Sequence, residues 1–198
     1  SEARFPLFTT PIGPHARQPI NTALRGRAGI FYVASDAVGA SSLLWASKDG
    51  MKTWQDMGGR TGGRHTTFAM LNDGQTILGL GGKNSDLNGY LPKSISDDGG
   101  KTWKVSPTRF PAYGANQRPC LLRLKSGRLL FCGDFQRIDG ASPVTITKRG
   151  AFAALSDDDG VTWHVKKLPG VQPHENPRHH GGAGTIGYSV ARQSPNGM

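Results

Sequence analysis

Short apolar runs separated by turn-forming residues cover most of the chain. Examples are residues 31–34 (FYVA), 76–80 (TILGL) and 129–132 (LLFC), which consist of aromatic, β-branched and other aliphatic side chains. Asn72-Asp73-Gly74 precedes one such run and has the composition of a hairpin turn. Many short strands joined by glycine-rich turns predict an all-β protein. No run approaches the roughly 18 consecutive apolar residues of a membrane helix, so no membrane span is expected.

The predicted strands fall into groups that repeat along the chain. The second and third groups each contain four strands, at residues 64–71, 76–80, 93–96 and 101–105, and at residues 118–124, 129–132, 150–156 and 162–165. Arg118, which opens the third group, stands 54 residues after Arg64, which opens the second. A first group includes strands at 31–34 and 42–47, and residues 188–193 begin a fourth.

One eight-residue pattern recurs before the last strand of each group. Residues 96–103 (SDDGGKTW) and 156–163 (SDDDGVTW) share Ser, then Asp two places on, Gly four on, Thr six on and Trp seven on. A looser copy at 47–54 (SKDGMKTW) has its Gly one place earlier. Repetition at about 40 to 50 residues is typical of propellers and solenoids, and a four-stranded repeat is a propeller blade. The sequence therefore predicts a partial β-propeller.

The repeats predict one incomplete domain over residues 1–198. The expected blades span about 18–57, 62–106 and 115–166, and the start of the next blade spans about 183–198. The repeat pattern stops inside the turn formed by Asn196 and Gly197. On this hypothesis further blades close the ring, and the isolated chain has an exposed apolar edge, low stability and no activity.

The repeated Ser-x-Asp-x-Gly-x-Thr-Trp pattern resembles the Asp-box, or bacterial neuraminidase repeat, of the sialidase-like propeller superfamily. The resemblance covers roughly residues 20–198 and implies a ring of about six or seven blades. Asp-boxes join the third and fourth strands at the blade periphery, so Asp49, Asp98 and Asp158 are expected to be scaffold residues. The superfamily includes sialidases, other glycosidases, polysaccharide lyases and non-enzymatic propellers. The pattern therefore indicates the fold more strongly than the reaction.

The chain is strongly basic, with 24 Lys and Arg against 14 Asp and Glu and a net charge of +10. A basic surface attracts anions such as nucleic acid, acidic lipid or acidic polysaccharide. Because the sequence contains no Lys/Arg run and no nucleic-acid-binding motif, we expect an acidic oligo- or polysaccharide partner and no nucleic acid. The expected location is extracellular or periplasmic, although residues 1–10 show no signal peptide.

No cofactor or metal is expected. The two cysteines, Cys120 and Cys132, flank a predicted hairpin and lack the spacing of a zinc site. They form either a cross-strand disulfide or a pair of buried thiols.

Two arginines are candidates for binding an acidic sugar. Arg64 and Arg118 begin equivalent inner strands, and two converging guanidinium groups suit a carboxylate. Sialidases carry Arg-Ile-Pro at the start of such a strand, and this chain departs from that pattern with His65 and Thr66. Sialidases also place a basic residue and then an acid/base Asp in the loop after the inner hairpin. Lys83 and Asp86 resemble that pair, although Asp86 also fits an exposed turn.

His65 supports a different reaction. Polysaccharide lyases need a base, an acid and a cation that neutralises a uronate carboxylate. His65, Tyr113 and Arg118 are candidates for these roles, and a packing role for the histidine is equally open. His179 and His180 lie in a histidine-rich segment and are further candidates for contacting substrate.

Three functional hypotheses follow from these residues. The leading hypothesis is a sialidase-type hydrolase that removes terminal acidic sugars, with Asp86 as acid/base and Arg64, Lys83 and Arg118 as anion contacts. The first alternative is a polysaccharide lyase that acts by β-elimination on uronic-acid-containing chains. The second alternative is a carbohydrate-binding propeller without catalysis.

Overall fold

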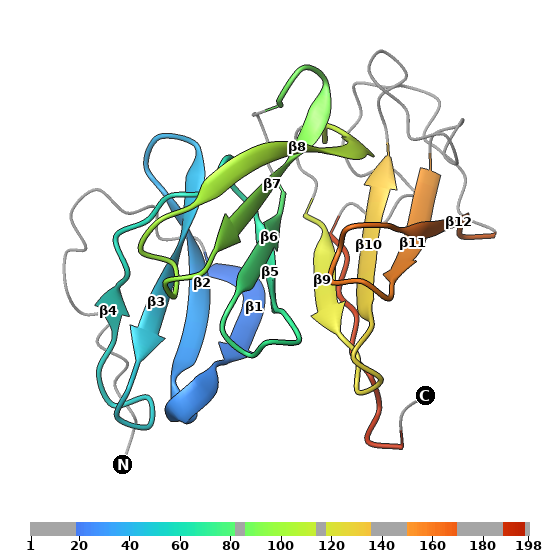
Figure 1. Cartoon of the computed structure of the whole chain (residues 1–198). Helices are drawn as coiled ribbons and strands as arrows, with labels where there is room; N and C mark the ends of the chain where they lie inside the picture. The colour runs from blue at the N-terminus through green and yellow to red at the C-terminus, as the bar shows by residue number, and fades with distance from the viewer. Residues whose placement is uncertain (1–18, 82–85, 114–117, 136–149, 170–187, 197–198) are drawn as a thin grey trace.

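The described part of the chain forms three four-stranded antiparallel sheets (Figure 1). The computed structural model describes residues 19–81, 86–113, 118–135, 150–169 and 188–196. Blade 1 consists of β1 (Pro19–Arg25), β2 (Phe31–Ala37), β3 (Ser41–Ser47) and β4 (Gln55–Asp56). Blade 2 consists of β5 (Thr67–Met70), β6 (Ile77–Leu80), β7 (Tyr90–Ser96) and β8 (Lys104–Pro111). Blade 3 consists of β9 (Cys120–Arg123), β10 (Leu129–Phe135), β11 (Gly150–Ser156) and β12 (His164–Lys167).

The predicted all-β partial propeller is confirmed by these three blades. The described helical structure is a single 3-10 turn, Arg27–Gly29, between β1 and β2. In the described ranges no helix has the length and apolar character needed to cross a bilayer.

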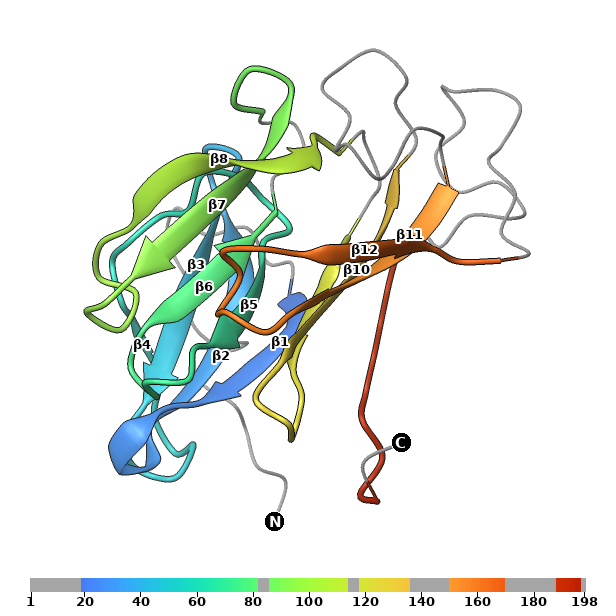
Figure 2. The ribbon, with the colours of Figure 1, turned by 45° about the vertical axis from the view of Figure 1, so that its right-hand side comes forward.

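The innermost strands of the three blades lie side by side at the centre (Figures 1 and 2). Hydroxyl groups of two threonines link them. Thr22 on β1 accepts a hydrogen bond from Phe68 N at 3.3 Å, and Thr67 on β5 accepts one from Leu121 N on β9 at 2.9 Å. Because these bonds fix each inner strand relative to the next, the residues before β5 and β9 come together at the same end of the blades.

Apolar packing fills the space between blades 2 and 3. Phe110 on β8 lies against Phe131 on β10 and Phe152 on β11, with ring centroids 4.9 and 5.6 Å away. The Trp163 ring lies 5.6 Å from that of Phe110. Strand β3 is buried along its whole length. It therefore appears in the sequence as a continuous run rather than as an alternating pattern.

The repeated eight-residue segments form equivalent turns between the third and fourth strands of each blade. In blade 2, Asp98 Oδ1 accepts hydrogen bonds from two backbone N–H groups, both at 3.0 Å, and from Ser96 Oγ at 2.8 Å. Its Oδ2 accepts a bond from Thr102 Oγ1 at 2.6 Å. Asp49 and Asp158 bond to the Ser and Thr of their own turns in the same way. These aspartates therefore build the turns.

The looser copy in blade 1 forms the same turn at a conformational cost. Two successive residues in each turn have positive φ, and in blade 2 these are Gly99 (75°) and Gly100 (90°). In blade 1 they are Gly50 and Met51, both at 71°. The methionine adopts a left-handed conformation that side chains disfavour, yet its N–H still donates to Ser47 Oγ at 2.9 Å. The hydrogen bonds, rather than the glycine, define the turn.

These hydrogen bonds lower the pKa of the turn carboxylates. Burial alone would raise the pKa of Asp98, but the hydrogen bonds from Thr102 and Ser96 outweigh it and lower the pKa to about 2. Hydrogen bonds from Thr162 lower the pKa of Asp158 to about 2. Because both values lie below the ordinary value of about 4, the ionised turns contribute stability above about pH 4. That contribution is lost as the pH falls towards 2.

Asp98→Asn and Asp158→Asn are each expected to lower the Tm at neutral pH. The loss is modest because Asp158 is exposed and Asp98 only half-buried, so solvent screens both carboxylates. The difference from the wild type should shrink as the pH falls from about 4 to about 2, and thermal melts over this range measure it. Asp97→Asn is the control, because Asp97 is exposed and pairs with the exposed Lys104. An equal loss in the control would contradict the prediction.

A second set of contacts joins the blades near the hairpin turns of their inner strands. Arg27 of blade 1 donates to the backbone oxygen of Asp73 in the blade 2 turn. Arg123 on β9 donates to Met70 O at 2.8 Å and pairs with Asp159 at 2.6 Å. Neighbouring blades are therefore fastened at this end as well as along their inner strands.

The structure corrects several strand boundaries. The sequence predicts strands at 64–71 and 118–124, but β5 and β9 begin later, at Thr67 and Cys120. The strands predicted at 31–34 and 129–132 continue three residues further, to Ala37 and Phe135. The strand β1 was not identified from the sequence. Cys120 and Cys132 lie directly opposite each other, as predicted, and are thiols.

Candidate functional site

Asp36 lies at the centre of a polar cluster where blades 1 and 2 meet. It stands near the end of β2 and is completely buried. Its Oδ1 accepts hydrogen bonds from His65 N at 2.7 Å and from Ser42 Oγ at 3.2 Å. Its Oδ2 lies 3.0 Å from His65 Nε2 and 3.4 Å from Arg64 Nη2. One carboxylate therefore positions both the backbone and the side chain of His65.

The segment that carries His65 is held in a strained conformation. His65 has a φ of 58°, in the left-handed region. Such a backbone is uncommon for a side chain of this size and persists only where surrounding contacts impose it. Here Thr66 N donates to Ser42 Oγ at 3.1 Å, and Thr66 Oγ1 donates to Gly63 O at 2.6 Å. Gly81 packs directly beneath, because a Cβ there would lie 2.6 Å from Thr66 Cα.

The hydrogen bonds assign the proton of His65. Nε2 lies 3.0 Å from Asp36 Oδ2, so the neutral ring carries its proton on Nε2 and donates it to the carboxylate. Arg118 Nη2 lies near the same nitrogen, but at the longer distance of 3.4 Å. The Nδ1 atom then holds a lone pair, and it is buried without a hydrogen-bond partner among the described residues. An acid that orients a histidine and leaves its other nitrogen basic is a common arrangement for a general base.

Arg118 connects this cluster to the C-terminal segment. It lies just before β9, and its guanidinium carbon is 5.3 Å from the centre of the Tyr188 ring. Tyr188 forms a parallel bridge with Arg118, and Ser189 N donates to Arg118 O at 3.0 Å. The cluster of Asp36, His65, Arg118 and Tyr188, with Arg64 at its side, therefore draws residues from three blades and the segment that follows.

The cluster favours binding of an anion. It contains two guanidinium groups, on Arg64 and Arg118, and one carboxylate, on Asp36. These are the charged groups among the described residues of the cluster. About a third of the Arg64 side chain is exposed. A guanidinium group is well suited to a sugar carboxylate because it donates two parallel hydrogen bonds.

Tyr113 occupies a separate apolar position beside β10. Its ring is buried, and its hydroxyl lies over Gly133 without a hydrogen-bond partner among the described residues. Burial raises the pKa of Tyr113 well above its ordinary value, and the charges of Asp134 and Cys132 raise it further. The hydroxyl therefore keeps its proton. Asp134 is also buried, and its place on β10 is equivalent to that of Asp36 on β2, five residues beyond the partner of the repeated serine.

Gly133→Ala is expected to destabilise the protein by about 1–3 kcal/mol through overpacking. The added Cβ would lie 1.9 Å from the Tyr113 hydroxyl and 2.9 Å from its ring carbon Cζ. In a Tyr113→Phe background the oxygen is absent, so the cost of the same alanine should be smaller. Denaturant unfolding of the four proteins in this double-mutant cycle gives the coupling. Equal costs in both backgrounds would show that the hydroxyl does not lie over Gly133.

The structure brings together some of the predicted site residues and separates others. Arg64, His65 and Arg118 share the cluster. Asp86 is exposed and accepts a hydrogen bond from Gly89 N at 2.9 Å, so it caps its own turn. Lys83, His179 and His180 lie outside the described residues.

Two acidic residues and one aromatic residue in this region were not predicted. Asp36 and Asp134 each lie two residues beyond a predicted strand end, where a polar side chain suggested a loop. The signal that could have identified both aspartates is an acidic residue near the end of an otherwise largely apolar strand. Tyr188 carried no signal of its own, because only the fold brings it to Arg118.

Other parts of the described structure are weaker candidates for a functional site. A cavity of about 310 Å³ lies between blades 1 and 2 near the opposite end of β2, with Tyr32, Met57 and Met70 in its wall. Its lining combines Arg27, Lys48 and Lys101 with Asp97 and Asp98, so charges of both signs line it. Among the described residues no three His, Cys, Asp or Glu side chains gather as metal ligands.

Comparisons with known proteins rest on structure alone. No protein-family model matches the sequence, and no curated protein matches it significantly. A protein of unknown function from Dyadobacter fermentans has a TM-score of 0.54 at 16% identity, over 79% of this chain and 46% of its own. The K499G mutant of NanB sialidase from Streptococcus pneumoniae has a TM-score of 0.51 at 16% identity, over 74% of this chain and 23% of its own.

A third structure is the α-L-arabinanase of Penicillium chrysogenum complexed with arabinobiose, with a TM-score of 0.50 at 18% identity, over 79% of this chain and 50% of its own. The chain thus spans half or less of each of these proteins. At such low identity the likeness concerns the fold. This chain has the β-propeller fold of these proteins.

Proposed function

We propose that the protein binds an acidic polysaccharide and cleaves it by β-elimination at a uronic acid. The observation that carries the proposal is the cluster in which Asp36 orients His65 and Arg118 lies 3.4 Å from the histidine. A base beside a carboxylate-binding cation is what proton abstraction next to a carboxylate requires. The glycan-acting solved structures of the same fold, a sialidase and an arabinanase, support a glycan substrate.

In the proposed reaction, Arg118 and Arg64 bind the uronate carboxylate and stabilise the charge that develops on it. His65 Nδ1 takes the proton from C5 of the sugar, a step that requires substrate binding to open the place where this atom is buried. The C4–O4 bond then breaks, its electron pair leaves with O4, and the C5–H electron pair forms the C4=C5 double bond. Tyr113, the acid expected from the sequence, is buried in a separate apolar position with a raised pKa, so O4 takes its proton from water.

The second candidate is the sialidase-type hydrolase with Asp86 as acid/base. The two arginines and the likeness to NanB sialidase favour it. It requires Asp86, which caps an exposed turn, to act as an acid. Elimination agrees better with the observed contacts because its base is already oriented.

We also infer that the repeated turns are Asp-boxes, that the full protein closes a ring of about six or seven blades, and that it works outside the cytoplasm. The hydrogen bonds shared by the turns of Asp49, Asp98 and Asp158 support the first point. The extent of the solved structures beyond the matched part supports the second.

The test incubates the full-length protein separately with uronic-acid polysaccharides and with sialosides. Ultraviolet absorbance detects the unsaturated uronate, and a second assay measures free sialic acid. We expect unsaturated product and no sialic acid. Sialic acid without unsaturated product would favour the hydrolase, and retained glycan binding with neither product would favour a non-catalytic propeller.

A further inference from the structure

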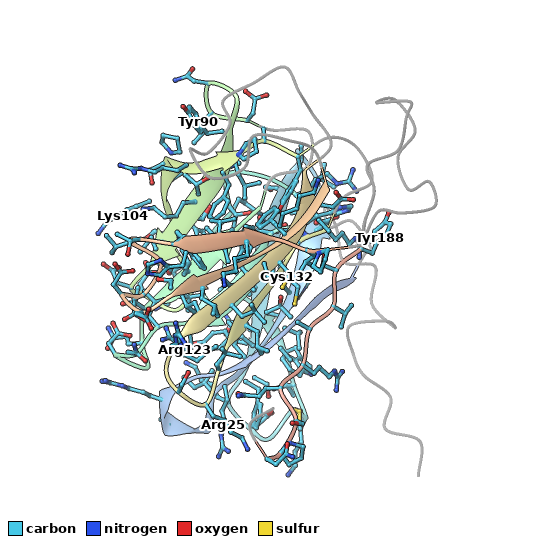
Figure 3. All side chains as sticks on the ribbon, turned by 90° about the vertical axis from the view of Figure 1, so that its right-hand side faces the viewer. Arg25, Tyr90, Lys104, Arg123, Cys132 and Tyr188 are labelled. Carbon is cyan, nitrogen blue, oxygen red and sulfur yellow. The ribbon has the colours of Figure 1, made fainter. Side chains whose placement is uncertain are left out.

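Tyr188 combines a fixed backbone with an exposed ring. Ser189 N donates to Arg118 O at 3.0 Å, and Ala191 N lies 3.2 Å from Cys120 Sγ, so the segment is held against β9. Ser189 is buried, whereas 56% of Tyr188 is exposed. Figure 3 shows Tyr188 projecting outward from this segment. A large aromatic ring that is held in place yet open to solvent is suited to contact a ligand.

The ring is also placed next to the proposed chemistry. The Arg118 guanidinium lies 5.3 Å from the ring centre, and Nη2 of the same group lies 3.4 Å from His65 Nε2. A ligand carboxylate on Arg118 would therefore lie beside the Tyr188 ring. The contact with Arg118 uses only part of the ring surface, because more than half of the residue remains exposed.

We infer that Tyr188 forms a subsite for the sugar ring adjacent to the acidic sugar held by Arg118. This inference rests on the proposed function for the acidic sugar itself. The apolar C–H face of a pyranose ring packs on an aromatic side chain, while Arg118 binds the neighbouring carboxylate. The ligand class is therefore a chain of at least two sugar residues rather than a single acidic sugar.

The test compares two ligands, glucuronate and a glucuronate-containing tetrasaccharide, by titration calorimetry on the full-length protein. Tyr188→Ala should weaken tetrasaccharide binding on the order of tenfold and leave glucuronate binding nearly unchanged. Tyr188→Phe keeps the ring and should bind both ligands like the wild type. Val190→Ala is the matched control, because Val190 is exposed on the same segment and should have no effect.

The outcomes separate the subsite from the reaction. If Tyr188→Ala weakens both ligands equally, the tyrosine only positions Arg118 and the subsite is wrong. A loss restricted to the tetrasaccharide, together with no unsaturated product, would support the subsite and overturn the elimination. Unsaturated product, without a loss of binding in Tyr188→Ala that is restricted to the tetrasaccharide, would support the elimination and overturn the subsite. Failure of the wild type to bind either ligand would overturn both.

Discussion

Asp36→Ala is expected to lower the free energy of unfolding by about 3–5 kcal/mol, the usual cost of removing one partner from a buried charged network. The substitution removes a buried acceptor of hydrogen bonds from His65 N, His65 Nε2 and Ser42 Oγ. The contact between Asp36 and Arg64 contributes less to the free energy of unfolding, because it is 3.4 Å long and the arginine is partly exposed. Chemical denaturation of the variant and the wild type measures the difference.

The effect should depend on pH. Burial alone would raise the pKa of Asp36, but hydrogen bonds from the side chain and backbone of His65, together with the charge of Arg64, outweigh it, so the pKa is lowered. The stabilisation is therefore present above the ordinary pKa of about 4 and is lost as the pH falls through the folded value. The difference in the free energy of unfolding between the wild type and Asp36→Ala should therefore become smaller at acidic pH. A gap that widens there would contradict the assignment.

Two further variants make the Asp36 measurement specific. Asp36→Asn keeps an oxygen acceptor and should cost less than the alanine. Asp56→Ala removes a carboxylate that pairs with Arg60 at 2.8 Å nearer the surface, and should cost about 1 kcal/mol or less. If Asp56→Ala is as damaging as Asp36→Ala, burial is not what makes Asp36 important.

His65→Asn is expected to reduce elimination activity by about 10²- to 10⁴-fold, the usual contribution of a general base. Asparagine is the best-matched replacement because it tolerates the positive φ of 58° at this position, whereas alanine would add strain. The fall should appear mainly in kcat, since Arg118 still binds the substrate carboxylate. The initial rate of unsaturated uronate formation at several substrate concentrations gives both kcat and KM.

The control for this variant is His164→Asn, because His164 is exposed on β12, the outermost strand of blade 3. It should retain full activity. A thermal melt of His65→Asn shows whether the fold is intact. Full activity in a folded His65→Asn protein would refute His65 as the base.

The fold could be predicted because its signals are local. The turn around Asp98 needs only Ser96 and Thr102 nearby, so its sequence and its hydrogen bonds repeat together in each blade. Strand ends were less predictable, because they depend on contacts between blades. The strand after Arg64 begins at Thr67 because Asp36, from the preceding blade, imposes the left-handed conformation on His65.

The site could be predicted only in part for the same reason. Arg64 and Arg118 were found because the repeat gives them equivalent places. Asp36 gains its importance only when the fold brings it to His65, which stands 29 residues later. Tyr188 reaches Arg118 across 70 residues of sequence. No spacing rule within one repeat relates either pair.

The division of the cluster among blades has a consequence for biosynthesis. Asp36 emerges from the ribosome with the first blade, His65 with the second, and Arg118 with the third. A nascent chain can therefore complete each sheet in turn before the cluster exists. His65 acquires its orientation only when blade 2 docks on blade 1, and Arg118 joins it only when blade 3 follows. Formation of the cluster would then report the docking of these blades rather than the formation of any single sheet.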